Sequence, residues 1–176
     1  MIIRAMALEE LERIPEIDIT EDGTIVYYFK NGVLEASTEE WHRPQWTPED
    51  WREGTWTHFL SENGIKIWGC LEGERLAGFV VYRPCLTESM AQLLALFVSR
   101  DQRRKGIASQ LCQLLYQAAI RDSHDTLYVS ATPSKSAVGF YLSEGFKPTE
   151  DVHPELYALE PEDIHMIKDL SDLDSA

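Results

Sequence analysis

A change of hydrophobic period near residue 103 constrains the fold of this chain more than any other feature. Residues 89–99 are rich in apolar side chains and have the character of a strand. From Arg103 onward the apolar residues recur instead on one helical stripe, at Ile107, Leu111, Leu114, Leu115 and Ala118. Residues 126–131 again have the composition of a strand. Because a strand, a helix and a strand follow one another, we expect a crossover connection to a parallel neighbour.

The rest of the chain supplies further strands and helices. β-rich runs predict strands, and other segments have the features of helices. The predicted strands cover residues 2–4, 24–29, 33–37, 65–71, 75–82 and 164–170, and the predicted helical segments cover residues 8–13, 47–62 and 134–144. This order predicts a single α/β (α+β) domain over residues 1–176, with helices flanking a central, mostly antiparallel sheet.

Turn signals mark several boundaries between these elements. Asn31-Gly32 separates two strands and predicts a hairpin, because both residue types tolerate positive φ. Thr47, which is followed by a proline and two acids, has the form of a helix start. Asn63-Gly64 has the form of a helix stop.

The charge of the chain argues against two classes of partner. Its 30 acidic and 16 basic residues give a net charge of −14, which repels nucleic acids and anionic lipid surfaces. No apolar run reaches the ~18 residues of a membrane-spanning helix. Acidic residues also occupy positions 9, 10 and 12, where a signal peptide is apolar. We therefore expect a cytoplasmic protein with no nucleic-acid or membrane partner.

Neither the cysteines nor the histidines have the spacing of a metal site. Cys70, Cys85 and Cys112 lie in apolar stretches without C-x-x-C spacing, so we expect buried, reduced thiols. The five histidines do not pair at i, i+4 or with a cysteine. The sequence therefore predicts no metal site.

The turn before the amphipathic helix has the features of an anion site. Four of the 16 bases lie within residues 100–105. Free backbone N–H groups collect at a helix start, where the dipole favours an anion, and Gly106 and Ala108 leave them accessible. The turn therefore predicts a site for a diphosphate. The patterns G-x-G-x-x-G and G-x-x-x-x-G-K-[ST] are absent, which excludes the dinucleotide and P-loop versions of such a site.

Two linked motifs resemble those of the GNAT superfamily of acyl-CoA-dependent N-acyltransferases. Arg103-x-x-Gly106-x-Ala108 matches the family pattern [R/Q]-x-x-G-x-[G/A], within a longer V-x-x-x-x-R-x-x-G-I-A that begins at Val98. The second motif is a helix that carries a tyrosine and closes in Gly-Phe, matched by residues 136–146. The resemblance implies the GNAT fold, in which the mixed, mostly antiparallel sheet is splayed between its fourth and fifth strands.

The resemblance also implies a binding site for acetyl-CoA. The diphosphate would lie on the turn and the first amides of the helix, and pantetheine would hydrogen-bond to the backbone of the fourth strand. A free N–H in that strand could polarise the thioester carbonyl. Ser134 stands where many members have an asparagine and is a weaker candidate for a cofactor contact. The implied residues are Leu96, Phe97, Val98, Arg103, Arg104, Lys105, Gly106, Ile107, Ala108 and Ser109.

The same resemblance implies a reaction. Tyr141 matches the family's general acid, placed to protonate the departing thiolate, and a phenol of pKa ~10 holds its proton at neutral pH. We expect an N-acetyltransferase that moves the acetyl group of acetyl-CoA to a primary amine by direct attack in a ternary complex. No general base is identifiable, since the fourth strand offers Gln92 but no carboxylate near its splay. The alternative is a non-catalytic acyl-CoA-binding or sensing module on the same fold.

The acceptor is less constrained than the donor. The acidic body of the chain favours a positively charged small-molecule or peptide amine. Trp46 with Glu21, Asp22, Tyr27 and Tyr28 is a candidate pocket for it. The sequence leaves open the identity of the amine, whether the acyl group is strictly acetyl, and whether the chain forms a homodimer.

Overall fold

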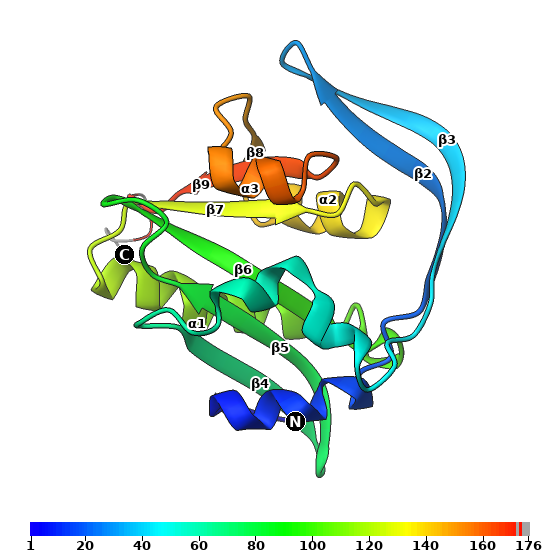
Figure 1. Cartoon of the computed structure of the whole chain (residues 1–176), viewed down its shortest axis with the longest axis vertical. Coiled ribbons are helices and arrows are strands. Elements are labelled where there is room, and N and C mark those ends of the chain that lie inside the picture. The colour runs from blue at the N-terminus through cyan, green and yellow to red at the C-terminus, as the bar shows by residue number, and fades with distance from the viewer. Residues whose placement is uncertain (172, 174–176) are drawn as a thin grey trace.

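The computed structural model describes residues 1–171 and 173, whose strands form a seven-stranded sheet and a separate hairpin (Figure 1). The strands of the sheet are β1 (Ile2–Ala5), β4 (Lys66–Glu72), β5 (Arg75–Arg83), β6 (Met90–Val98), β7 (Thr126–Ala131), β8 (Lys147–Pro148) and β9 (Ile164–Asp169). Their order is β1-β4-β5-β6-β7-β9-β8. Neighbours are antiparallel except β6 and β7, which are parallel. The predicted mixed, mostly antiparallel sheet is confirmed.

Helices pack on both faces of this sheet. α1 (Ile107–Arg121) is the predicted crossover between β6 and β7, and α2 (Lys135–Ser143) shares its core. A 3₁₀ helix, Leu8–Glu16, packs on the opposite face against β5. α3 (Pro154–Leu159) and the short β8 were not predicted. Of the predicted stripe on α1, Leu114 is half-buried and the other four residues are buried: Ile107, Leu111, Leu115 and Ala118. No helix in the described part of the chain is long and apolar enough to cross a bilayer.

The single helix predicted over residues 47–62 is wrong. The segment forms two short 3₁₀ helices, Asp50–Glu53 and Thr55–Phe59. Gly54 between them is extended (φ −60°, ψ 140°) and ends the first helix. This break lets both Trp51 and Trp56 enter the core, where their rings stack with centroids 6.2 Å apart. Burial of two large aromatic side chains five residues apart outweighs a continuous helix here.

A long hairpin lies outside the main sheet. Its strands are β2 (Glu21–Lys30) and β3 (Val33–Arg43). Asn31 (φ 52°) and Gly32 (φ 73°) join them, as predicted. The hairpin curves along one side of the molecule and over α2 (Figure 1), where Tyr27 N donates to Pro133 O at 2.8 Å.

The parallel strands β6 and β7 separate soon after they meet. They pair over residues 90–92 of β6 and 126–128 of β7. Beyond these pairs, their facing edges have no strand partner among the described residues. β6 also bulges at Leu94, the extra residue between the β5-paired Leu93 and Ala95. The structure thus has the predicted splay.

The cysteines divide into two groups, which corrects the expectation that all are buried. Cys70 and Cys112 are buried, whereas Cys85 is exposed. Cys85 follows β5 in a loop beyond the end of the strand, where the sheet does not cover it. Burial raises the pKa of the Cys112 thiol to about 12.

Candidate functional site

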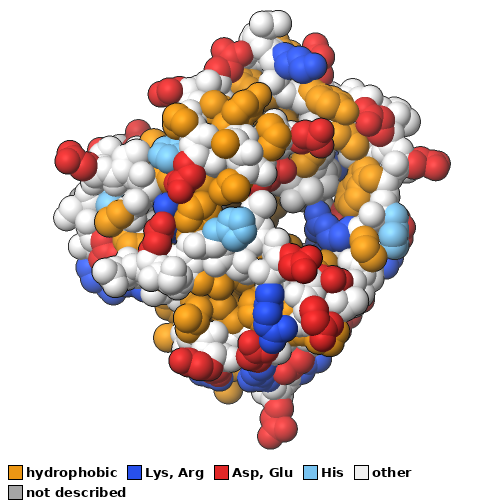
Figure 2. Space-filling model, in the orientation of Figure 1, with side chains coloured by type: hydrophobic (Ala, Val, Ile, Leu, Met, Phe, Trp, Pro, Cys, Tyr) orange, Lys and Arg blue, Asp and Glu red, His pale blue; other side chains and the backbone are white. Residues whose placement is uncertain are grey.

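A cavity of about 590 Å³ opens between the separated ends of β6 and β7. The basic turn before α1, helix α2, the open end of the β2–β3 hairpin and the loop between α3 and β9 also line it. Figure 2 shows the molecule hollowed near the centre of this face, with hydrophobic, basic and acidic side chains around the hollow. The splay therefore brings together segments that are far apart in the sequence.

The basic turn supplies a row of free backbone N–H groups. Arg104 (φ 61°) and Gly106 (φ 77°) both adopt the left-handed conformation. Within the described residues, the amides of residues 104–109 donate to no carbonyl or side chain. The hydrogen bonding of α1 begins only with Gln110 N, which donates to Gly106 O at 3.1 Å. Amides in such a turn, at the positive end of a helix dipole, suit a phosphate or diphosphate.

Gly106 leaves room for an anion to approach these amides. A Cβ at this position would have Gln110 Nε2 as its near neighbour, at 3.8 Å. The φ of 77° is also one that L side chains rarely adopt. Glycine therefore permits both the turn conformation and close approach of a ligand.

The basic side chains of the turn have different contacts. Arg103 donates to a Glu21 carboxylate oxygen at 3.0 Å and to the carbonyl at the end of β6 at 3.2 Å, so it ties the turn to the hairpin and the sheet. Arg104 lines the cavity. The Lys105 ammonium instead donates to a glutamine side chain at 2.8 Å and is not at the cavity. Its backbone amide remains in the row of free N–H groups.

The cavity edge of β6 is the second implied surface for the donor. Leu96, Phe97 and Val98 pair with β5 on one edge and line the cavity beyond the splay. The Phe97 ring packs against Trp46 and Phe79, with centroids 4.6 and 5.6 Å away. The side chain of Phe97 thus belongs to the core, while an extended ligand could hydrogen-bond to the open edge as an added strand.

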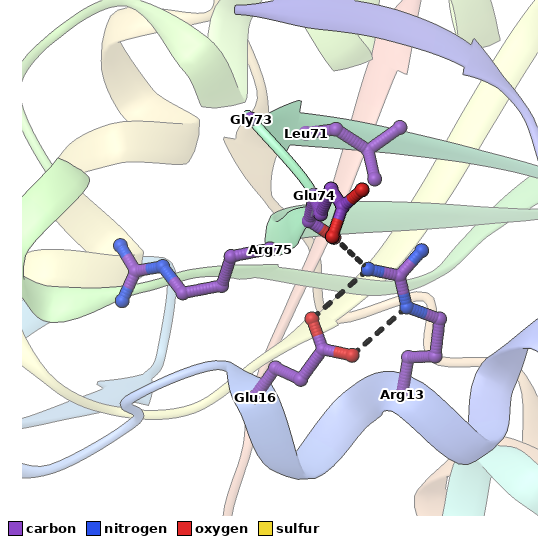
Figure 3. A pocket seen from close by; sticks show the side chains of 6 residues that line it. All are labelled: Arg13, Glu16, Leu71, Gly73, Glu74 and Arg75. Carbon is purple, nitrogen blue, oxygen red and sulfur yellow. Dashed lines mark hydrogen bonds and ion pairs between the residues drawn. The ribbon is translucent and has the colours of Figure 1, made fainter.

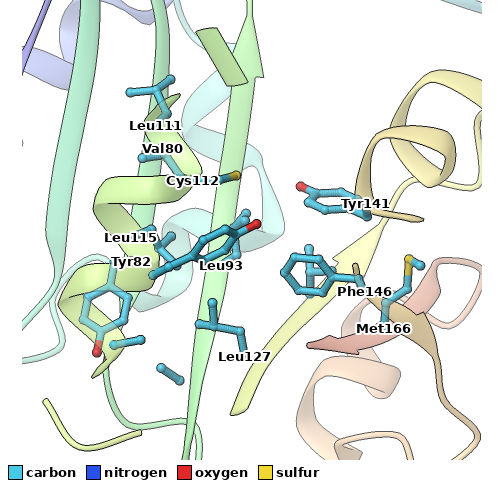
Figure 4. Packing of buried hydrophobic residues seen from close by; sticks show 14 of the residues in the cluster. Val80, Tyr82, Leu93, Leu111, Cys112, Leu115, Leu127, Tyr141, Phe146 and Met166 are labelled. Atoms are coloured by element: carbon cyan, nitrogen blue, oxygen red, sulfur yellow. The ribbon is translucent and has the colours of Figure 1, made fainter. Parts of the chain in front are cut away.

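Tyr141 lies on α2 at the wall of the same cavity. Its ring packs against Phe140 and Phe146, with centroids 5.3 and 5.4 Å away. Figure 4 shows its hydroxyl directed toward the α1 side, where Cys112 lies. Burial, with smaller contributions from Cys112 and Asp163, raises the pKa of Tyr141 well above its usual value. The hydroxyl therefore stays protonated and can donate.

Two carboxylates that sequence reasoning missed also lie at the cavity. Glu160 and Asp163 belong to the loop between α3 and β9. Ala131 of β7 pairs with Ile164 of β9, so Asp163 lies next to the end of β7. Burial raises the pKa of Asp163 to about 7, Glu160 adds to the rise, and Arg43 opposes it. A carboxyl group of this kind can exchange a proton near neutral pH.

The predicted acceptor pocket does not form as expected. Glu21 lines the cavity, but its carboxylate is shared by Arg103 at 3.0 Å and Arg43 at 3.5 Å. Neighbouring residues of a strand point to opposite faces, so Glu21 and the next residue cannot share one pocket. The other four residues are not among those that line the cavity. Asp22 pairs with His42, Tyr27 packs on the core beside α2, Tyr28 donates to Glu39, and Trp46 packs on Phe97.

Gln92 lies at the splay but is engaged by a buried arginine. Arg83 Nη1 donates to Gln92 Oε1 at 3.1 Å. Arg83 also pairs with Glu62 at 2.7 Å and lies 3.9 Å from the centroid of the Phe59 ring. We interpret this network as structural support for the end of the paired region.

A second hollow lies at the turn between β4 and β5 (Figure 3). Arg13 is one of the residues that line it and pairs with Glu16 at 2.9 Å. Arg13 also donates to the carbonyl oxygen of Glu74. Since these groups bind one another in an open depression, the splayed cavity is the stronger candidate site.

Comparison with known proteins identifies relatives of the chain. The model of the GNAT acetyltransferase family matches residues 31–146. Human N-acetyltransferase 8 is 35% identical over 96 residues, which are 52% of this chain and 42% of that protein. Mouse N-acetyltransferase 8B is 31% identical over 96 residues, or 52% of this chain and 41% of that protein. The matched region thus spans less than half the length of these relatives.

Solved structures share the fold at low sequence identity. Nourseothricin acetyltransferase superposes with a TM-score of 0.72 at 16% identity, over 96% of this chain and 98% of that one. A Bacillus anthracis protein in complex with acetyl coenzyme A has a TM-score of 0.67 at 17% identity, over 94% and 96%. PaiA N-acetyltransferase from Thermoplasma acidophilum, in complex with coenzyme A, has a TM-score of 0.61 at 18% identity, over 96% and 98%. These similarities establish the fold.

Proposed function

The chain belongs to the GNAT acetyltransferase family, and from this premise we propose that it is an N-acetyltransferase that moves the acetyl group of acetyl-CoA to a primary amine. The observation that carries the proposal is the row of free amides at residues 104–109, which opens into the cavity at the splay. We assign the diphosphate of acetyl-CoA to these amides, with Arg104 beside them.

We assign the acetyl-pantetheine part of acetyl-CoA to the cavity between the turn and Tyr141. The open edge of β6 at Leu96, Phe97 and Val98 offers backbone groups to the amides of pantetheine. This direction leads the thioester toward Tyr141, which lines the far wall. A backbone N–H of β6 near the thioester carbonyl would stabilise the negative charge that develops there.

Tyr141 is assigned to the leaving group. Because burial keeps its hydroxyl protonated, it can donate to the sulfur as the carbon–sulfur bond breaks. Its packing between Phe140 and Phe146 fixes the ring, so the hydroxyl is held in one place.

Direct attack by the amine is favoured over a cysteine acyl-enzyme. Cys112 lies close enough to Tyr141 to raise the pKa of that residue. However, burial raises the pKa of Cys112 itself to about 12. A thiol must be a thiolate to act as a nucleophile, so Cys112 is inert at neutral pH. The amine therefore attacks within a ternary complex.

The acceptor end of the cavity contains charged groups of both signs. These include Arg43, Glu160 and Asp163. Glu21, which pairs with both Arg43 and Arg103, lies between them and the basic turn. We propose that the acceptor is a small-molecule or peptide amine that enters as an ammonium ion, which the carboxylates attract.

The test is to incubate the protein with acetyl-CoA and a panel of primary amines: spermidine, tyramine, L-lysine and kanamycin. We expect acetyl-CoA-dependent thiol release, an acetylated product by mass spectrometry, and inhibition by ADP, which carries the diphosphate alone. Tight acetyl-CoA binding with neither thiol release nor product would instead indicate the non-catalytic binding module.

A further inference from the structure

We propose that Asp163 is the group that binds the ammonium form of the acceptor and takes a proton from it, a role that rests on the proposed acetyl transfer. The observation behind it is a carboxylate at the cavity wall that is not engaged by the protein. Among the described residues, its oxygens accept no hydrogen bond and form no ion pair, although its backbone N–H donates to Glu160 O at 3.2 Å.

The neighbouring carboxylate differs in this respect. Glu160 also lines the cavity, but its side chain accepts a hydrogen bond from the hydroxyl of Thr55. Glu162, in the same loop, is exposed and does not line the cavity. Asp163 is therefore the carboxylate of this loop that is free to bind a cationic group in the cavity.

A buried histidine holds the loop that carries Asp163. His165 Nδ1 lies 2.8 Å from the Tyr128 hydroxyl, and His165 Nε2 lies 3.0 Å from Glu160 O. A neutral imidazole protonated on Nε2 satisfies both contacts, since Tyr128 then donates to Nδ1 and Nε2 donates to the carbonyl. Burial lowers the pKa of His165 and so favours this neutral form. The loop is thus tied to β7 and β9, and Asp163 is kept at the end of β7.

The charges around Asp163 suit a proton acceptor at neutral pH. Burial raises its pKa to about 7, and Glu160 and Glu162 act in the same direction. Arg43, from the hairpin, lowers the pKa without forming an ion pair with Asp163. On the α2 side stands the protonated Tyr141, whose own pKa is raised in part by Asp163. The cavity therefore contains one group that keeps its proton and one that can accept a proton.

The proposed proton transfer balances the reaction. The ammonium loses one proton to Asp163, and the freed lone pair forms the carbon–nitrogen bond as the carbon–sulfur bond breaks. Tyr141 gives its proton to the sulfur, which leaves as the thiol, and the second proton that the nitrogen loses as the amide forms restores the Tyr141 hydroxyl. One proton is released for each ammonium ion acetylated, through Asp163 to solvent.

The experiment compares Asp163→Asn with Glu162→Gln, which makes the same chemical change one residue away on an exposed side chain. For the amine of the panel that is used best, we expect wild-type kcat/KM to rise with pH to a plateau with a midpoint near 7. Asp163→Asn should lower kcat/KM by about 10²–10⁴-fold and remove this midpoint, because the base is gone. Glu162→Gln should stay within about threefold of the wild type, a small change typical of a surface group, and keep the midpoint, moved slightly to lower pH because the Glu162 charge no longer raises the pKa of Asp163.

Other outcomes are decisive as well. If kcat/KM of Asp163→Asn is within threefold of the wild-type value and has the same pH midpoint, the proposal is overturned. If no amine of the panel is acetylated, the same comparison is made on acetyl-CoA hydrolysis, in which water loses the proton. If calorimetry detects no acetyl-CoA binding to the wild-type protein, the proposed function fails, and the role of Asp163 fails with it. If the wild-type protein binds acetyl-CoA and Asp163→Asn turns over like the wild type, the role of Asp163 is overturned and the proposed function stands.

Thermal unfolding gives a second readout that also reports folding. Asp163 has a pKa of about 7 in the folded protein, above its unfolded value. The unfolded chain therefore releases this proton at lower pH, and the stability that the protonated carboxyl provides is lost as pH rises toward 7. Asp163→Asn keeps a neutral group there, so its Tm should exceed that of the wild type at pH 8 and match it at pH 4. An equal Tm difference at both pH values would contradict a half-buried Asp163 that titrates near pH 7.

Discussion

At the scale of single residues, the cavity contains two ionisable groups, one that keeps its proton at neutral pH and one that can release or accept a proton there. Burial keeps the Tyr141 hydroxyl protonated, and the same desolvation brings the pKa of Asp163 to about 7. Acetyl transfer from a thioester to an ammonium ion needs one group that donates toward sulfur and one that removes a proton from nitrogen. The surroundings of Tyr141 suit donation toward sulfur, and those of Asp163 suit removal of a proton from nitrogen.

Replacing Tyr141 by phenylalanine removes the hydroxyl and keeps the ring that packs between Phe140 and Phe146. We expect kcat to fall by about 10²–10⁴-fold, the usual contribution of a positioned acid, while the Kd for acetyl-CoA changes little. Thiol release from pH 6 to 9 measures the first quantity, and calorimetry measures the second. The wild type should show no alkaline loss of kcat over this range, because its hydroxyl does not ionise there. A Tyr141→Phe protein with normal turnover would limit Tyr141 to packing.

At the scale of elements, α2 depends on the residue that precedes it. Ser134 Oγ accepts a hydrogen bond from Ala137 N at 3.2 Å and so caps the helix that carries Tyr141. Ser134 is buried and does not line the cavity. The structure shows the role of a cap, and we expect Ser134 to act in this way and not as a cofactor contact.

The variant Ser134→Ala separates these two roles. Loss of the cap should reduce the free energy of unfolding by about 1 kcal/mol, measured by urea denaturation, with acetyl-CoA affinity unchanged in calorimetry. A tenfold weaker Kd with unchanged stability would show that the hydroxyl contacts the cofactor instead.

Most elements could be predicted because their signals are local. Residues close together in the sequence were enough to predict the apolar stripe of α1, the Asn31-Gly32 turn and the two ends of β7. The two 3₁₀ helices in place of residues 47–62 could not be predicted, because the tryptophans turn inward only in the presence of the sheet. Nor does periodicity identify the six-residue α3 or the two-residue β8, which are too short to show it.

The site could be predicted on its donor side more completely than on its acceptor side. The donor side is a continuous stretch of β6, turn and α1, which a sequence motif can capture. The acceptor side combines a hairpin and the loop before β9, which meet only through the topology. The signal for Asp163 was nevertheless present. If the predicted strands 126–131 and 164–170 pair antiparallel, residue 163 must lie at the end of the first, next to the splay.

At the scale of the whole molecule, the proposed function requires an acidic protein to bind an anionic ligand at one basic turn. The net charge of −14 disfavours acetyl-CoA in general. We therefore propose that binding depends on the local field of the turn, where free amides, the α1 dipole and Arg104 coincide. A carboxylate placed in this turn should abolish binding, whereas one placed in another surface turn should not.

Calorimetric titration of acetyl-CoA into Gly106→Glu and Gly73→Glu tests this claim most directly. Both glycines lie in turns with positive φ, 77° and 61°, and a Cβ meets no atom within 3.4 Å at either, so backbone strain and charge change are matched. Gly73 lies in the β4–β5 turn, away from the cavity. We expect wild-type affinity for Gly73→Glu and no detectable binding for Gly106→Glu, with both proteins folded. Equal affinity of the two variants for acetyl-CoA would contradict the assignment of the diphosphate to the turn before α1.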